Sequence, residues 1–90
     1  MSRYSKRKKH RLVGIGARMC RLRNLAGIRS TELALLMEVD LSMPSHWEVG
    51  YSEIRLADAV RFCDIVGCSL DAIARGPAEL LPEGERRGVG

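Results

Sequence analysis

Aromatic side chains are scarce in this 90-residue chain, at 4% of the residues, although 46% of the residues are hydrophobic. Leu, Ala, Ile, Val and Met supply most of the apolar side chains, a mixture that suits helices better than a β-sandwich. No run approaches the roughly 18 consecutive apolar residues of a membrane span. No apolar stretch follows the basic N-terminus, as a signal peptide would require. We therefore expect one all-α domain that stays in the cytoplasm and contacts no membrane.

Cysteine and histidine are also few, with three and two residues. Cys20, Cys63 and Cys68 are odd in number and lie in apolar-periodic segments, so we expect buried free thiols and no disulfide framework. A zinc site typically needs ligand pairs at short spacing, and the only histidines are His10 and His46, so no metal site is predicted. The sequence suggests no paired carboxylates and no nucleophile beside a base. We therefore expect no catalytic residues, no cofactor and no small-molecule ligand.

Acidic residues are missing from the first eleven positions, where six basic residues occur. Such a block is typical either of a solvated, disordered tail or of an arm that binds a polyanion. Residues 1–12 have too little apolar content to pack, so we expect them to be disordered in the free protein. The basic residues of this arm are Arg3, Lys6, Arg7, Lys8, Lys9 and Arg11.

Apolar residues spaced three and four apart predict five short helices after the arm. Gly14 and Gly16 are interpreted as flexible residues at the approach to the first helix. Pro, Gly and charged residues dominate the end of the chain, which we expect to be loose. The helices are expected at about residues 15–25, 30–37, a segment ending at 49, 56–66 and 70–75. The predicted organisation is a basic arm at 1–13, a helical domain at 14–76 and a flexible tail at 77–90.

A turn of three or four residues joins the second and third expected helices, which is the helix-turn-helix arrangement whose third helix enters the major groove of DNA. Residues 15–50 and 56–76 resemble the repressor and Cro type helix-turn-helix family of phage and bacterial regulators. The resemblance is carried by Arg23, Gly27, Glu32, Leu33, Ala34, Val39, Trp47, Glu48, Gly50, Gly67, Ser69, Leu70 and Asp71, which fall in register where the family places such residues.

The resemblance implies a compact five-helix, lambda-repressor-like domain that binds double-stranded DNA at the nucleoid as a transcriptional regulator or repressor. A homodimer is expected, because one short helix reads too few bases for useful selectivity. In the family, residues at the places of Arg23 and Glu48 tend to pair across helices, and Ser30 would touch a phosphate. The base-facing residues would be Leu41, Ser42, Ser45 and His46, of which Ser45 also has the DNA backbone in reach.

Two residues depart from the family pattern. Glu38 stands where the family usually has glycine, so the turn is either strained or differently shaped. Pro44 would lack an N–H and crowd the Asp40 carbonyl if Asp40 capped the third helix. Proline is well suited to a first helical turn. We therefore predict that the third helix begins at residues 42–44 and that Leu41 lies in the turn.

Charge places most of the expected phosphate contacts in the arm. Residues 12–76 contain seven basic and eight acidic residues, so counterion release must come mainly from the arm. Tyr51 and Arg55 are secondary phosphate candidates, although a solvated charge at a helix start explains Arg55 equally well.

Two alternatives stay open. One is a protein-interaction module, or an antitoxin that also binds DNA, which would use the third-helix surface or Leu80 and Leu81. Pro44, Glu38 and the near-neutral domain favour it. The other is non-specific binding of nucleic acid, RNA included, through the arm alone.

Overall fold

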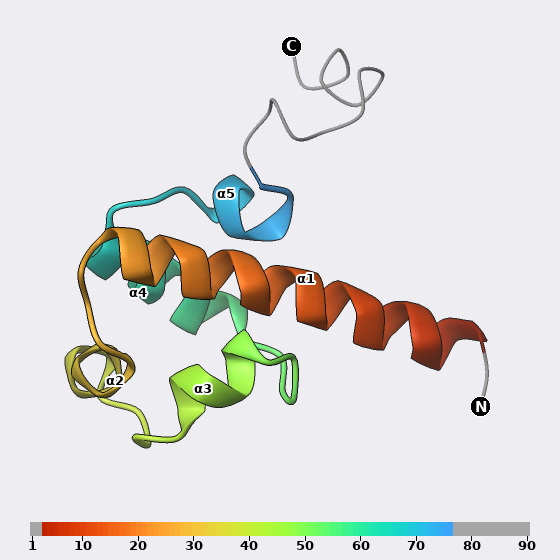
Figure 1. Ribbon diagram of the computed structural model, residues 1–90, viewed down its shortest axis with the longest axis horizontal. Helices are drawn as coiled ribbons and strands as arrows, with labels where there is room; N and C mark the ends of the chain where they lie inside the picture. The colour runs from red at the N-terminus through yellow and green to blue at the C-terminus, as the bar shows by residue number, and fades with distance from the viewer. Residues whose placement is uncertain (1–2, 77–90) are drawn as a thin grey trace, which may run out of the picture.

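The computed structural model describes the backbone of residues 3–76 and the side chains of residues 11–76. This part of the chain forms five helices and no strand, which confirms the all-helical prediction (Figure 1). The helices are α1 (Arg3–Leu25), α2 (Ser30–Met37), α3 (Met43–Glu48), α4 (Leu56–Val66) and α5 (Leu70–Ala74). The predicted tail at 77–90 lies outside the described residues.

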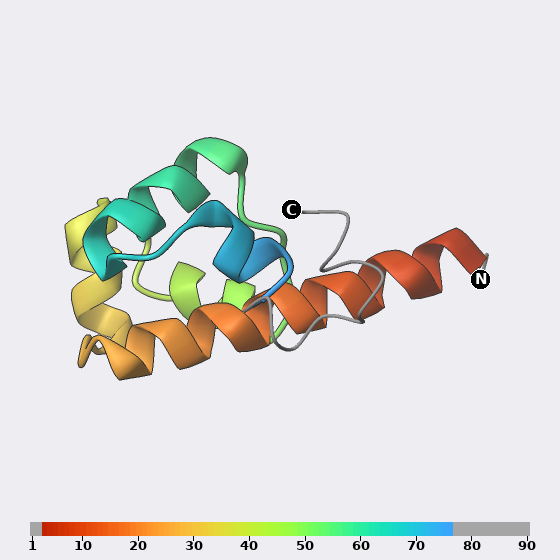
Figure 2. The same ribbon diagram turned by 90° about the horizontal axis from the view of Figure 1, so that it is seen from above.

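Helix α1 begins twelve residues earlier than the predicted start at Ile15, so a disordered arm over residues 3–12 is not confirmed. Figure 1 and Figure 2 both show its N-terminal part extending beyond the other helices. The prediction of disorder relied on apolar content, which indicates whether a segment can pack but not whether it forms a helix. Lys and Arg, which are frequent in residues 3–12, have high helix propensity. Once residues further along α1 are packed, the helix can lengthen without a new nucleation step.

A single core draws side chains from all five helices. Phe62, Met19 and Leu33 are among its largest fully buried residues. Trp47 of α3 and Ile73 of α5 are also buried in this core, so even the two shortest helices are anchored by buried side chains. Burial of a large apolar side chain stabilises by about 1.5–3 kcal/mol, which exceeds what helices this short gain on their own.

Arg18 ties α5 to α1. Its Nε donates to the carbonyl oxygen of Ile73 at 2.8 Å and its Nη2 to that of Ala74 at 2.8 Å. These carbonyls end α5 and lack partners within the helix. At the other end, the Ser69 hydroxyl accepts a hydrogen bond from the Ala72 N–H at 3.1 Å. A five-residue helix is thereby capped at both ends.

Among residues 3–76, no helix combines the length and the apolarity needed to cross a membrane.

Candidate nucleic-acid interface

The turn between α2 and α3 opens with a left-handed residue. Glu38 has φ 58° and ψ 43°, so the strained form of the turn is the one adopted. The conformation costs a residue with a Cβ roughly 1–2 kcal/mol. Val39 follows, partly buried against the core, and its N–H donates to the Ala34 carbonyl at 3.0 Å. The reversal of the chain after α2 is thus stabilised by a backbone hydrogen bond and an apolar contact.

Helix α3 begins late, in agreement with the prediction from Pro44. Its first residue is Met43, Ser42 occupies the N-cap, Leu41 lies in the turn and Pro44 stands in the first helical turn. Pro44 is also fully buried. The missing N–H of proline therefore removes no helical hydrogen bond, and its ring adds to the core.

Asp40 organises this helix start. Its Oδ1 accepts hydrogen bonds from the Ser42 N–H at 3.0 Å and from the Ser42 hydroxyl at 2.8 Å. The hydrogen bonds from the Ser42 backbone and side chain lower the pKa of Asp40. A carboxylate therefore stands at the N-terminal end of α3, with its charge held beside a predicted base-facing residue.

Arg23 and Glu48, which the family resemblance expects to pair, form a two-pronged ion pair. Nε of Arg23 lies 2.6 Å from Oε2 of Glu48, and Nη2 lies 2.9 Å from Oε1. Nη1 donates to the Ile28 carbonyl at 2.8 Å. The side chains are only 11% and 8% exposed, and the hydrogen bonding that Arg23 donates to Glu48 is the main cause that raises the pKa of Arg23. The pair fixes the last residue of α3 against α1.

Gly16 permits a close approach at the same end of α3. It is a buried residue within α1, and a Cβ at this position would overlap the carbonyl oxygens of Trp47 and Glu48. Gly14 and Gly16 are therefore helical residues and not a flexible approach to the helix. With its C-terminal end held in this way, α3 presents its outer face to solvent.

The predicted base-facing residues lie in one region of the structure, but their side chains differ in exposure and in the contacts they already make. Leu41, Ser42 and Ser45 are exposed. The Ser42 hydroxyl is already bonded to Asp40. His46 is half-buried, and its ring lies 4.9 Å from that of Tyr51, centroid to centroid. Ser45 has only a long contact, 3.4 Å between its Oγ and that of Ser30, and Leu41 is 55% exposed, so these two side chains are the freest of the four.

The predicted phosphate contacts fall in three places. Ser30 begins α2, and its Oγ lies 3.4 Å from Oγ of Ser45, so one phosphate oxygen can reach both hydroxyls. Tyr51 is exposed in the loop after α3. Arg55 lies 3.5 Å from the carboxylate of Asp58. Arg11 is exposed on α1, and the other arm residues lie on its N-terminal turns.

Asp40 is the residue at this surface that sequence reasoning missed as a functional feature. Sequence reasoning treated Asp40 only as a possible helix cap. A signal was present, because an Asp two residues before a Ser is typical of a side chain that bonds the backbone ahead of it. Its role as a fixed negative charge on the candidate surface follows only from the late start of α3 at Met43.

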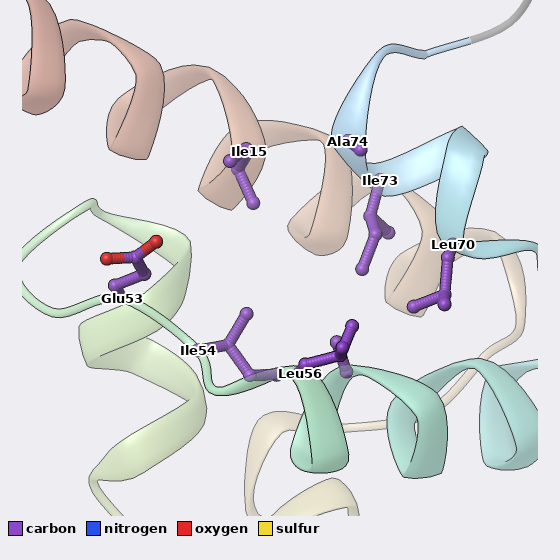
Figure 3. A pocket seen from close by; sticks show the side chains of 8 residues that line it. Ile15, Glu53, Ile54, Leu56, Leu70, Ile73 and Ala74 are labelled. Carbon is purple, nitrogen blue, oxygen red and sulfur yellow. The ribbon is translucent and has the colours of Figure 1, made fainter.

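A pocket of about 280 Å³ opens on another side of the molecule, between α1, α4, α5 and the loop before α4 (Figure 3). In Figure 3, Ile15, Ile54, Leu56 and Ile73 point toward one another. Leu56 is also exposed to solvent at its rim. The remaining lining residues are Glu53, Ala59, Leu70 and Ala74.

Comparisons of the chain with protein families, with curated proteins and with solved structures found no match. The chemistry of these surfaces therefore carries the functional assignment.

Proposed function

We propose that the protein is a DNA-binding transcriptional regulator of the repressor and Cro type, with α3 as its recognition helix. The observation that carries this proposal is the helix pair α2 and α3, joined by a tight turn at Glu38 and locked to α1 by Arg23 and Glu48. A helix that reads DNA must be held so that its outer face stays fixed relative to the phosphate contacts. The ion pair at one end of α3 supplies that support.

The two hydroxyls of Ser30 and Ser45, 3.4 Å apart, suit a phosphate oxygen. They orient the protein on DNA without adding charge. The charge comes from the first eleven residues, which hold six basic residues, while residues 12–76 have one acid more than they have bases. The basic part of α1 accordingly supplies affinity, and α3 supplies a modest preference for sequence.

The dimer is proposed to form through the side of the molecule that bears α5. Leu56, Val60 and Leu70 are exposed apolar residues there, and Leu56 and Leu70 also line the pocket. Contiguous exposed apolar surface of this kind is typical of interaction sites. It leaves the outer face of α3 free.

A second candidate, a protein-interaction module or antitoxin, is favoured by the side chains around α3. Leu41, Val49 and Tyr51 are 55%, 68% and 77% exposed. Helix α3 has no Lys, Arg, Asn or Gln, which make the strongest bidentate contacts to bases. The ionised Asp40 would also repel a phosphate. A partner protein with an apolar surface would fit the exposed side chains of Leu41, Val49 and Tyr51.

Binding measurements at several salt concentrations separate these functions. The full-length protein is titrated with DNA from upstream of its own coding sequence and with scrambled DNA of equal length. If four phosphates are contacted by the arm, neutralising it should reduce the salt slope of log K by about 3–4. The neutralised variant combines Lys6→Gln, Arg7→Gln, Lys8→Gln and Lys9→Gln. A control with Arg86→Gln and Arg87→Gln removes two positive charges elsewhere, and the two variants are compared by the change in slope per charge removed.

Base reading in the major groove is tested by His46→Ala, which should reduce the preference for the upstream DNA by about 1–3 kcal/mol and leave binding to scrambled DNA unchanged. Ser45→Ala removes one of the two hydroxyls proposed to bind a phosphate, so it should weaken binding to both DNAs. Equal binding of both DNAs, lost on neutralisation of the arm, would establish non-specific binding instead. Absence of binding to either DNA would favour the protein-interaction module.

A further inference from the structure

Two of the three cysteines meet at the end of α4. Sγ of Cys68 lies 3.5 Å from Sγ of Cys63, in hydrogen-bond contact. Both are free thiols, Cys63 buried and Cys68 partly exposed. Cys20, on α1, instead accepts hydrogen bonds from Arg23 and Asn24. The chain therefore contains one thiol pair and one separate thiol.

The backbone holds the pair together. Gly67 ends α4 with φ 82°, a conformation that favours glycine, and its N–H donates to the Cys63 carbonyl at 2.8 Å. The Cys68 N–H donates to the same carbonyl at 3.1 Å. This helix ending regularly brings the residue after the glycine, here Cys68, into contact with the residue four positions before the glycine, here Cys63. An apolar pair would suffice for that contact, yet both positions carry a thiol.

We propose that Cys63 and Cys68 form a redox-active dithiol site that low-molecular-weight disulfides oxidise to an intramolecular disulfide. The sulfurs need to approach only from 3.5 Å to the roughly 2.05 Å of a disulfide bond. A bound metal ion would need further ligands, and the residues that the structure describes include no group of three or more suitable side chains around an ion. A disulfide, in contrast, needs only the two thiols of Cys63 and Cys68.

Cys68 is the more exposed of the two thiols and therefore reacts first. The Cys68 thiolate attacks one sulfur of the small disulfide, whose S–S bond breaks and releases one small thiol after it takes a proton. The Cys63 sulfur, having lost its proton to solvent, then attacks the Cys68 sulfur and releases the second small thiol. Two protein thiols are thereby oxidised to one disulfide, and one small disulfide is reduced to two thiols.

The second step is feasible although burial raises the pKa of Cys63 to about 12. A hydrogen bond with Cys68 contributes to that rise and is lost once Cys68 is in a mixed disulfide. A thiolate of high pKa is also the stronger nucleophile. Well-oriented intramolecular reactions reach effective molarities of about 10⁵ M or more, which compensates for a small thiolate fraction.

The test uses the full chain, oxidised glutathione and peptide mass spectrometry. Cleavage after Arg61 and Arg75 yields residues 62–75, which contain Cys63 and Cys68 but not Cys20. After oxidation and alkylation, this peptide from the wild type should lack two hydrogens, carry no glutathione and regain both thiols on reduction. Cys20 should be alkylated.

The variants distinguish the roles of the two thiols. Cys63→Ser and Cys63→Ala should each retain one glutathione on Cys68. In Cys68→Ser, glutathione should attach to Cys63 at least about tenfold more slowly than it attaches to Cys68 in the Cys63 variants, because the Cys63 sulfur is buried. Far-UV circular dichroism beforehand checks that each variant keeps its helices. Glutathione retained by the wild type, no reaction at all, or a disulfide to Cys20 would overturn the proposal, and the wild-type result decides without any variant.

Discussion

The two glycines inside α1 are expected to respond in opposite ways to the same added methyl group. At Gly14 a Cβ would meet only the guanidinium of Arg18, with Nη1 at 3.4 Å. That distance is at the edge of ordinary van der Waals contact, and the atom ends a long side chain. Alanine exceeds glycine in helix propensity by about 1 kcal/mol. Gly14→Ala should therefore raise the free energy of unfolding by about 0.5–1 kcal/mol.

At Gly16 the same methyl group meets backbone. The carbonyl oxygens of Trp47 and Glu48 occupy the space that the Cβ needs, and neither can rotate away as a side chain would. Overpacking of this kind costs about 1–3 kcal/mol, and the upper end applies because α1 and α3 must separate. After the gain in propensity of about 1 kcal/mol is subtracted, Gly16→Ala should lower the free energy of unfolding by about 2 kcal/mol.

Urea denaturation followed by circular dichroism measures both variants against the wild type. An unchanged m-value would show that the variants differ in stability and not in the extent of unfolding. The two substitutions share the helix and the chemistry, so propensity alone would move them together. If Gly16→Ala were as stable as Gly14→Ala, the close approach of α1 and α3 would be incorrect, and with it the support of α3.

Two further predictions concern the ends of α3. Glu48→Ala leaves the guanidinium of Arg23 half-paired, so the free energy of unfolding should fall by about 2–4 kcal/mol. The double variant with Arg23→Met and Glu48→Leu should lose clearly less free energy of unfolding than Arg23→Met and Glu48→Leu lose in total when made singly. Additive losses of stability in urea denaturation would contradict the pairing. Hydrogen bonds from Ser42 lower the pKa of Asp40 below its usual 3.8. Its ionised form therefore stabilises the folded state, fully above about pH 4, and this contribution is lost as the pH falls through the lower folded-state value. Wild type should lose more stability than Asp40→Asn on acidification below about pH 4, and parallel curves would refute this.

Local rules predicted most helix boundaries. Helices α2 and α4 end where apolar spacing and Gly67 predict, because both signals are read within a few residues. Pro44 gave the late start of α3 for the same reason, since its missing N–H excludes it from the helix interior. In each case the physical cause lies inside the segment itself.

Features that depend on distant residues were not predictable. Arg18 bonds carbonyls 55 and 56 positions away, and periodicity contains no information on such a contact. The start of α1 at Arg3 was also not predicted, because apolar content indicates packing and not the extension of an existing helix. Asp40 became part of the candidate surface only through the position of α3. The resemblance to a family suggested the pairing of Arg23 with Glu48, but not the third hydrogen bond to Ile28.

The continuous helix from Arg3 to Leu25 changes the thermodynamics of any contact made by the basic residues. A flexible arm loses about 1–2 kcal/mol of backbone entropy for each residue that it orders on a surface. A helical segment has already lost that freedom on folding, so binding a polyanion orders less of its backbone. Association then becomes sensitive to the angle of approach, because a rod cannot search nearby phosphates as a loose chain does. The gain in affinity per charge is therefore accompanied by a narrower range of productive encounters.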